Sequence, residues 1–135
     1  MIKNLFISPP SFVFKKIGVC ACYLFGSKNT KDFNEKSDYD LAIFVKSKQA
    51  IDYRSVLKQV LNIFKYPEKL HLSIVDLENT SPIFLYQVIK NSTLIYEYKN
   101  NYYVTLESMI MRLYFDDQYR NNIYFKFLKQ KYANR

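Results

Sequence analysis

Two short clusters of chemically active residues lie close together in the first third of the chain. Gly26 and Ser27 end one apolar run, and after ten further residues Asp38 and Asp40 open a second. Glycine leaves room for a phosphate to approach the backbone, and the N–H groups around a following serine can donate to phosphate oxygens. Two carboxylates that are two positions apart on a strand point to the same face, and Mg²⁺ prefers such oxygens together with phosphates. The pattern predicts phosphoryl or nucleotidyl transfer with a divalent metal ion.

The same residues also have a purely structural interpretation. Gly-Ser is a common turn dipeptide, and paired aspartates often lie on the surface where a strand begins. In this chain the turn follows an apolar run over residues 19–25, and the aspartates introduce another over residues 39–45. Both runs have the apolar content of buried strands. Because both clusters adjoin predicted strands, we favour the catalytic interpretation.

The rest of the chain alternates between strand and helix patterns. Further strands are predicted over residues 69–77 and 93–97. Pro9 and Pro10 suit the first turn of a short helix that Gly18 ends, and other helices are predicted over about 50–64, 81–91 and 104–131. The sequence therefore predicts an α/β (α+β) fold, with a mixed β-sheet, helices packed on one side of it and a long C-terminal helix.

Composition limits the classes of function. The chain has 135 residues, enough for a single domain spanning 1–135, and 49% of them are hydrophobic, as in globular proteins. No apolar run reaches the ~18 residues that a membrane span needs, so we expect a cytoplasmic protein without a membrane contact. Cys20 and Cys22 are too close for a disulfide and lack metal-ligand spacing, so we expect reduced thiols and no redox chemistry.

The net charge of +8 attracts nucleotides, nucleic acids and acidic protein surfaces alike. Lys28 and Lys31 lie between the two clusters, where they would face a triphosphate. The C-terminal lysines are interleaved with tyrosines, which suits either a solvated helix end or contact with RNA. The solvated helix end is the commoner of the two, so nucleic acid is not the expected partner.

The motifs resemble those of a known family. Gly26-Ser27, ten intervening residues and Asp38-Tyr39-Asp40 look like the signature of the minimal nucleotidyltransferases (MNT proteins) of the DNA polymerase beta superfamily. Val75-Asp76-Leu77-Glu78 and Leu94-Ile95-Tyr96-Glu97 follow the pattern of the MNT antitoxins that pair with HEPN ribonuclease toxins. The resemblance covers residues 19–131. It implies a nucleotidyltransferase fold, a hetero-oligomer with the toxin, and the use of ATP and Mg²⁺ to transfer AMP to a tyrosine of that toxin.

The resemblance also implies roles for individual residues. Gly26, Ser27 and Lys28 would hold the triphosphate, and Asp38 and Asp40 would coordinate Mg²⁺.

A third carboxylate, on a later strand, completes the metal site in the superfamily. Asp76 is the only acid of the strand that begins at Leu70, so it is the candidate for this catalytic and metal-binding role. Relatives often carry two aspartates three apart here, and Ser73 falls on the first of these positions. Two alternatives follow: Asp76 instead caps the strand end, or the catalytic position is 73 and this chain lacks the acid. His71, the chain's one histidine, is not assigned a metal.

Two other functions stay open. A chain that lacks the third acid could act as a binding-only antitoxin that blocks its toxin by occlusion. Nucleotidyl transfer to a small molecule is the other alternative, although enzymes of that kind usually carry an added substrate domain.

Overall fold

A four-stranded mixed sheet organises the protein, whose computed structural model describes residues 5–26 and 38–133. The strand order is β3-β2-β1-β4; β1 pairs antiparallel with both β2 and β4, and β2 pairs parallel with β3. The bounds are β1 Ala21–Phe25, β2 Tyr39–Phe44, β3 Leu70–Val75 and β4 Thr93–Glu97. The mixed sheet and the place of all four strands were predicted from the sequence.

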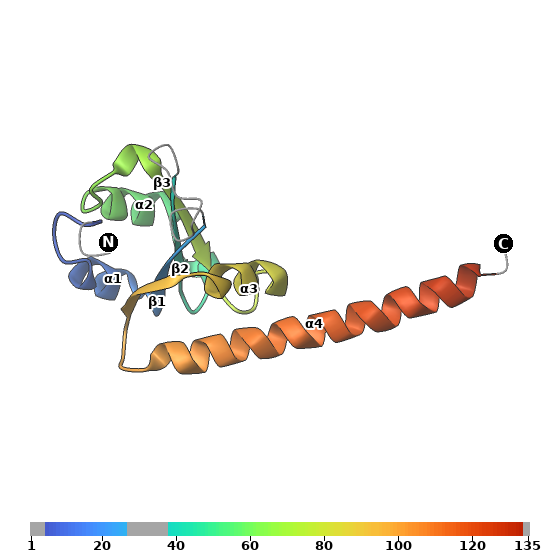
Figure 1. Cartoon of the computed structure of the whole chain (residues 1–135). Helices are drawn as coiled ribbons and strands as arrows, with labels where there is room; N and C mark the ends of the chain where they lie inside the picture. The colour runs from blue at the N-terminus through green and yellow to red at the C-terminus, as the bar shows by residue number, and fades with distance from the viewer. Residues whose placement is uncertain (1–4, 27–37, 134–135) are drawn as a thin grey trace.

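The helices are also close to the predicted ranges (Figure 1). Their bounds are α1 Ser11–Ile17, α2 Tyr53–Leu61, α3 Pro82–Lys90 and α4 Tyr102–Tyr132, with short 3-10 turns η3 Lys48–Ala50 and η4 Pro67–Lys69. Gly18 ends α1 in the left-handed conformation, with φ +89°, which glycine adopts without a steric penalty. Pro82 occupies the first turn of α3, where its missing N–H leaves no bond unmade.

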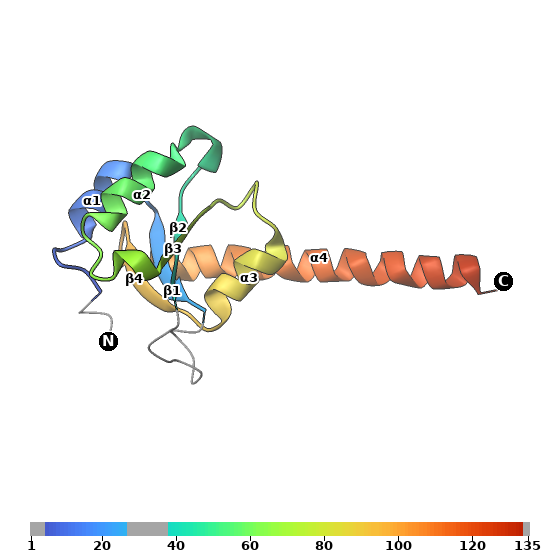
Figure 2. The ribbon, with the colours of Figure 1, turned by 90° about the horizontal axis from the view of Figure 1, so that it is seen from above.

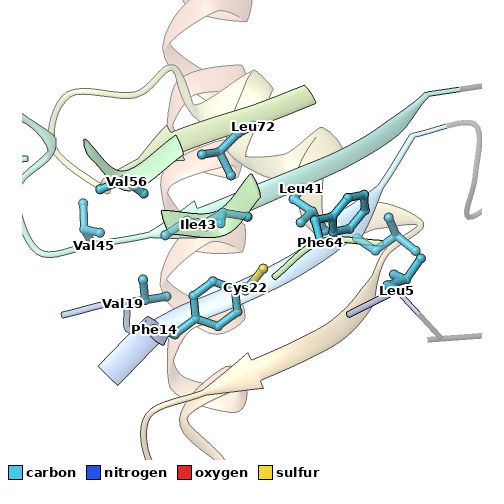
Figure 3. Packing of buried hydrophobic residues seen from close by; sticks show 12 residues of the cluster. Leu5, Phe14, Val19, Cys22, Leu41, Ile43, Val45, Val56, Phe64 and Leu72 are labelled. Atoms are coloured by element: carbon cyan, nitrogen blue, oxygen red, sulfur yellow. The ribbon is translucent and has the colours of Figure 1, made fainter. Parts of the chain in front are cut away.

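The helices cover both faces of the sheet, and in this respect the one-sided arrangement expected from the sequence is wrong (Figure 2). The central strands β1 and β2 bury alternate residues on opposite faces, so their apolar runs are continuous. One face packs against α1 and α2. Its buried cluster, drawn as sticks in Figure 3, comprises Leu5, Phe14, Val19, Cys22, Leu24, Leu41, Ile43, Val45, Val56, Val60, Phe64 and Leu72. The other packs against α3 and α4 through Ala21, Tyr23, Ala42, Phe44, Val75, Leu85, Val88, Leu106 and Ile110.

Helix α4 is anchored at its beginning and then leaves the sheet (Figures 1 and 2). Its buried residues are Leu106 and Ile110, and Glu107 accepts a hydrogen bond of 2.8 Å from the hydroxyl of the buried Tyr23. Tyr114 stacks on Tyr86 of α3, with ring centroids 4.0 Å apart. At 31 residues the helix is about 46 Å long, so its second half extends well past the rest of the protein.

Both cysteines are free thiols, and Cys22 is buried in the sheet. Burial raises the pKa of the Cys22 thiol, which keeps it protonated. In the described ranges, no helix combines the length and apolar character of a membrane span.

Candidate functional site

The end of β1 lies directly against the start of β2. In the antiparallel register Phe25 is opposite Asp40, so Gly26 turns away beside the Asp40 side chain. Gly26 has φ +80°, a conformation that residues with a Cβ rarely adopt. A Cβ built at this position would overlap Asp40 Oδ2 and lie 3.1 Å from Asp40 Cγ. Glycine is therefore required here both by its backbone conformation and by the carboxylate that packs against it.

Asp38 and Asp40 extend from the start of β2 to one side of the sheet. Asp40 alternates with Ala42 and Phe44, which face α3 and α4, so the carboxylates belong to that face. The Asp38 side chain is 48% exposed and that of Asp40 is 29% exposed. Burial raises the pKa of Asp40, and the charge of Asp38 raises it further, while His71 acts in the opposite direction. The pair thus gathers two carboxylates at a place that is open to solvent, an arrangement suited to a cation.

His71 is the third polar group at this place, and the sequence analysis gave it no role. In the parallel register of β2 and β3 it is the residue directly opposite Asp40. Its Nε2 lies 3.0 Å from Asp38 Oδ2, and its Nδ1 lies 4.0 Å from Asp40 Oδ1. The imidazole therefore contacts Asp38 closely and reaches toward Asp40. The register that brings the three together depends on strand pairing, for which the sequence offers no direct signal.

Asp76 lies at the opposite end of β3 from this pair. It follows the strand five residues after His71, about 16 Å further along at about 3.3 Å per residue. Its carboxylate is 1% exposed and accepts a hydrogen bond of 2.8 Å from the Lys48 backbone N–H and further bonds from the backbone and side chain of Asn79. Burial alone would raise the pKa of Asp76, but these hydrogen bonds lower it.

The structure thus does not bring Asp76 together with Asp38 and Asp40, and the prediction that Asp76 is their third carboxylate is wrong. Its carboxylate instead fixes the turn after β3 to η3, which matches the alternative of a cap at the strand end. Ser73, the other candidate position, is paired with Ala42 and shares the face of Asp40. Ser27 and Lys28 lie outside the described residues. Among residues 5–26 and 38–133, no three His, Cys, Asp or Glu side chains are arranged to hold a metal ion as they lie.

Two glycine substitutions separate the backbone and contact requirements of Gly26. At Gly18 the φ is also positive, but a Cβ would extend into open space. Gly18→Ala should therefore lower the unfolding free energy by about 1 kcal/mol. Gly26→Ala adds the overlap with Asp40 and should cost more, while also displacing the Asp40 carboxylate. Urea denaturation of the two variants measures the difference. Equal losses of unfolding free energy in the two variants would show that the contact of Gly26 with Asp40 does not affect stability.

Asp76→Ala tests the structural role of that carboxylate. The change removes the part-buried hydrogen bonds that the Lys48 and Asn79 N–H groups donate to Asp76, and it should lower the unfolding free energy by about 1–3 kcal/mol at pH 7. Because the folded pKa lies below the ordinary value of 3.8, this contribution is complete above that pH and is lost as the pH falls through the folded pKa. Asp52→Ala, at an exposed aspartate, is the control and should change little. Stability like that of the control would contradict the role.

The fold matches solved structures of toxin–antitoxin complexes. A chain of a toxin–antitoxin crystal structure with AMP-PNP superposes with a TM-score of 0.57 at 15% identity, covering 90% of this chain and 99% of that one. A variant of the pair MntA–HpeT gives 0.56 at 13% identity, with coverages of 90% and 99%. A tri-AMPylated HEPN toxin from Shewanella oneidensis in complex with MNT antitoxin gives 0.51 at 15% identity, with coverages of 87% and 95%. At identities this low, the superpositions show that these proteins share the fold of this chain.

No curated relative matches the chain. The family described as Polymerase beta, Nucleotidyltransferase matches residues 11–101, the part that runs from α1 through β4 and contains Gly26, Asp38 and Asp40. On this match, which spans more than half of the chain, the protein belongs to the polymerase beta nucleotidyltransferase family.

Proposed function

We propose that this protein is an antitoxin that transfers AMP from ATP to a tyrosine hydroxyl of a HEPN ribonuclease toxin and so silences it. The family supplies the reaction class. The solved structures of similar fold are toxin–antitoxin complexes, one of them with an AMPylated toxin, and they support the choice of acceptor. The observation that carries the proposal is the contact of Gly26 with Asp40, since it places a side-chain-free turn beside a carboxylate pair.

The chain's own groups would divide the work as follows. Asp38 and Asp40 would hold Mg²⁺, which would supply neutralisation of the charge on the triphosphate. Gly26 lets the turn lie directly against the Asp40 carboxylate, and Ser27 and Lys28 follow it in the sequence as the proposed phosphate-binding residues. The tyrosine oxygen would then bond to the α-phosphorus while the bond to pyrophosphate breaks, and the hydroxyl proton would pass to solvent water. This displacement needs mainly positioning and charge neutralisation, which the site is suited to provide.

The distal half of α4 is the proposed docking surface for the toxin. Beyond Ile110 no described residue of the helix is buried, yet large apolar side chains continue along it. The distal half of α4 would have only marginal helical stability in water by itself. A continuous row of exposed apolar side chains on a helix typically marks an interaction site. Residues 119–132 contain no acid, so an apolar surface with acidic groups is the complement. The exposed apolar residues are Phe115, Tyr119, Ile123, Tyr124, Phe125, Phe127 and Tyr132.

A binding-only antitoxin is the second candidate. It is favoured by the position of Asp76, because the described part of β3 then presents no carboxylate beside Asp38 and Asp40. Such a protein would block its toxin through α4 without modifying it.

Incubation of this protein with MgATP and its HEPN toxin should add the mass of AMP to the toxin. Intact mass spectrometry of the toxin measures this. The double variant Asp38→Asn, Asp40→Asn should lower the rate at least about a hundredfold, because the metal-holding charges are removed. Its melting temperature without divalent metal should stay level or rise, because burial and Asp38 disfavour the charged form of Asp40 more than His71 favours it.

The outcomes separate the two candidates. Tight toxin binding with no change in toxin mass would replace transfer by occlusion. Transfer at the parental rate by the double variant would refute the assignment of the metal to Asp38 and Asp40.

The docking surface is tested by Tyr119→Ala combined with Ile123→Ala, two residues that are four apart and share one face of α4. The pair should weaken toxin binding about tenfold or more, as loss of interface anchors does. Phe12→Ala on α1 is the matched control, because Phe12 is 77% exposed and belongs to another element. Isothermal titration with the toxin is the measurement. Unchanged toxin affinity, with weaker binding of a single-stranded RNA, would assign this surface to nucleic acid instead.

A further inference from the structure

The carboxylate pair faces an imidazole where a third acid is missing. On the face of Asp40, the alternating residues of β3 are His71, Ser73 and Val75, and none is acidic. Of these, His71 is the one opposite Asp40, and its ring nitrogens lie 3.0 Å from Asp38 Oδ2 and 4.0 Å from Asp40 Oδ1. Asp38 and Asp40 lie at the start of β2 and His71 lies on the neighbouring β3, and all three side chains are partly exposed to solvent.

The three groups supply two kinds of donor atom. Asp38 and Asp40 provide carboxylate oxygens, and a neutral imidazole provides one nitrogen lone pair. As the side chains lie, a nitrogen of His71 contacts the Asp38 carboxylate, so the ring must turn from it to present a nitrogen to an ion. The His71 side chain is 65% exposed, and this exposure leaves it free to change rotamer.

We propose that His71 is the third protein ligand of the cation site formed with Asp38 and Asp40, and that the site consequently prefers Mn²⁺ to Mg²⁺. The inference rests on the metal-holding role given to the two carboxylates under the proposed function. Mg²⁺ favours oxygen ligands and keeps its waters, whereas the affinity of nitrogen-containing sites rises along the first-row transition metals. Replacing one carboxylate of an all-oxygen site by imidazole therefore shifts the preference away from Mg²⁺.

A rival role for His71 predicts the opposite effect of its removal. As a counter-ion of the two carboxylates, a protonated imidazole would compete with the metal for the same oxygens. Its loss would then raise the affinity for every divalent cation. As a ligand, its loss lowers the affinity for Mn²⁺ most.

The experiment titrates Mn²⁺ and Mg²⁺ separately into the full chain, free of any affinity tag, by isothermal calorimetry without nucleotide or toxin. His71→Ala should lower Mn²⁺ affinity about tenfold or more, with less than about a threefold change for Mg²⁺. Ser73→Ala, two residues away on the same face, is the matched control and should leave both affinities unchanged. His71→Asp should raise Mg²⁺ affinity and reduce the ratio of the two affinities.

The results distinguish this inference from the proposed function. Absence of Mn²⁺ binding in the parent chain, or binding that survives Asp38→Asn with Asp40→Asn, would overturn the metal site itself. Parental binding with an equal or higher Mn²⁺ affinity in His71→Ala would overturn only the role of His71. A gain in Mg²⁺ affinity with Ser73→Asp but not with His71→Asp would place the third ligand at position 73 instead.

A spectroscopic measurement reports coordination directly. His71 is the chain's one histidine, so its ring nitrogens give unambiguous signals in a chain labelled with ¹⁵N-histidine. Addition of Zn²⁺ should shift one ring nitrogen in the parent chain and not in Asp38→Asn, Asp40→Asn. An unshifted imidazole in a chain that binds Zn²⁺ would refute ligation.

Discussion

The candidate site depends on how closely the end of β1 lies against the start of β2. Antiparallel pairing sets Phe25 opposite Asp40, and the chain must then turn away in a space that the Asp40 carboxylate already fills. Gly26 meets both demands, because it accepts a φ of +80° and has no Cβ to overlap the carboxylate. One contact therefore fixes the turn where the phosphates are proposed to approach and the direction of the acid that is proposed to hold the metal.

Apolar burial in the sheet offsets the unfavourable free energy of placing two carboxylates close together. A half-buried carboxylate beside a second one opposes folding, which is why the pKa of Asp40 is raised by burial and by Asp38. Strand β2 also buries Leu41, Ile43 and Phe44 almost completely beneath helices on both faces of the sheet. The free energy gained from this apolar burial offsets the unfavourable free energy of the carboxylate pair. Charge is thus confined to the strand ends, where water and a cation have access.

The sequence predicts local features of this fold better than those that depend on strand pairing. Turn residues and apolar periods locate every strand and helix to within a few residues, since Gly18, Pro82 and the run before Gly26 act through their own backbone conformation or burial. The expectation that the helices pack on one side of the sheet was mistaken, although the continuous apolar runs of β1 and β2 already indicate burial on both faces. The role of Asp76 was mistaken for another reason: it was chosen as the only acid of its strand, without knowledge of the register.

That register also limits what the third group of the site can be. A strand presents every second residue to a given face, so on β3 the neighbours of Asp40 are His71 and Ser73. Asp76 lies too far from Asp40 to join the site, and its carboxylate already accepts hydrogen bonds from Lys48 and Asn79. If the imidazole ligates, the protein itself completes a three-ligand site before nucleotide arrives. If it does not, two carboxylates remain, and the ion must take further ligands from the triphosphate. Metal and nucleotide binding would then be strongly coupled, so the identity of one β3 side chain decides whether the cation site exists independently of ATP.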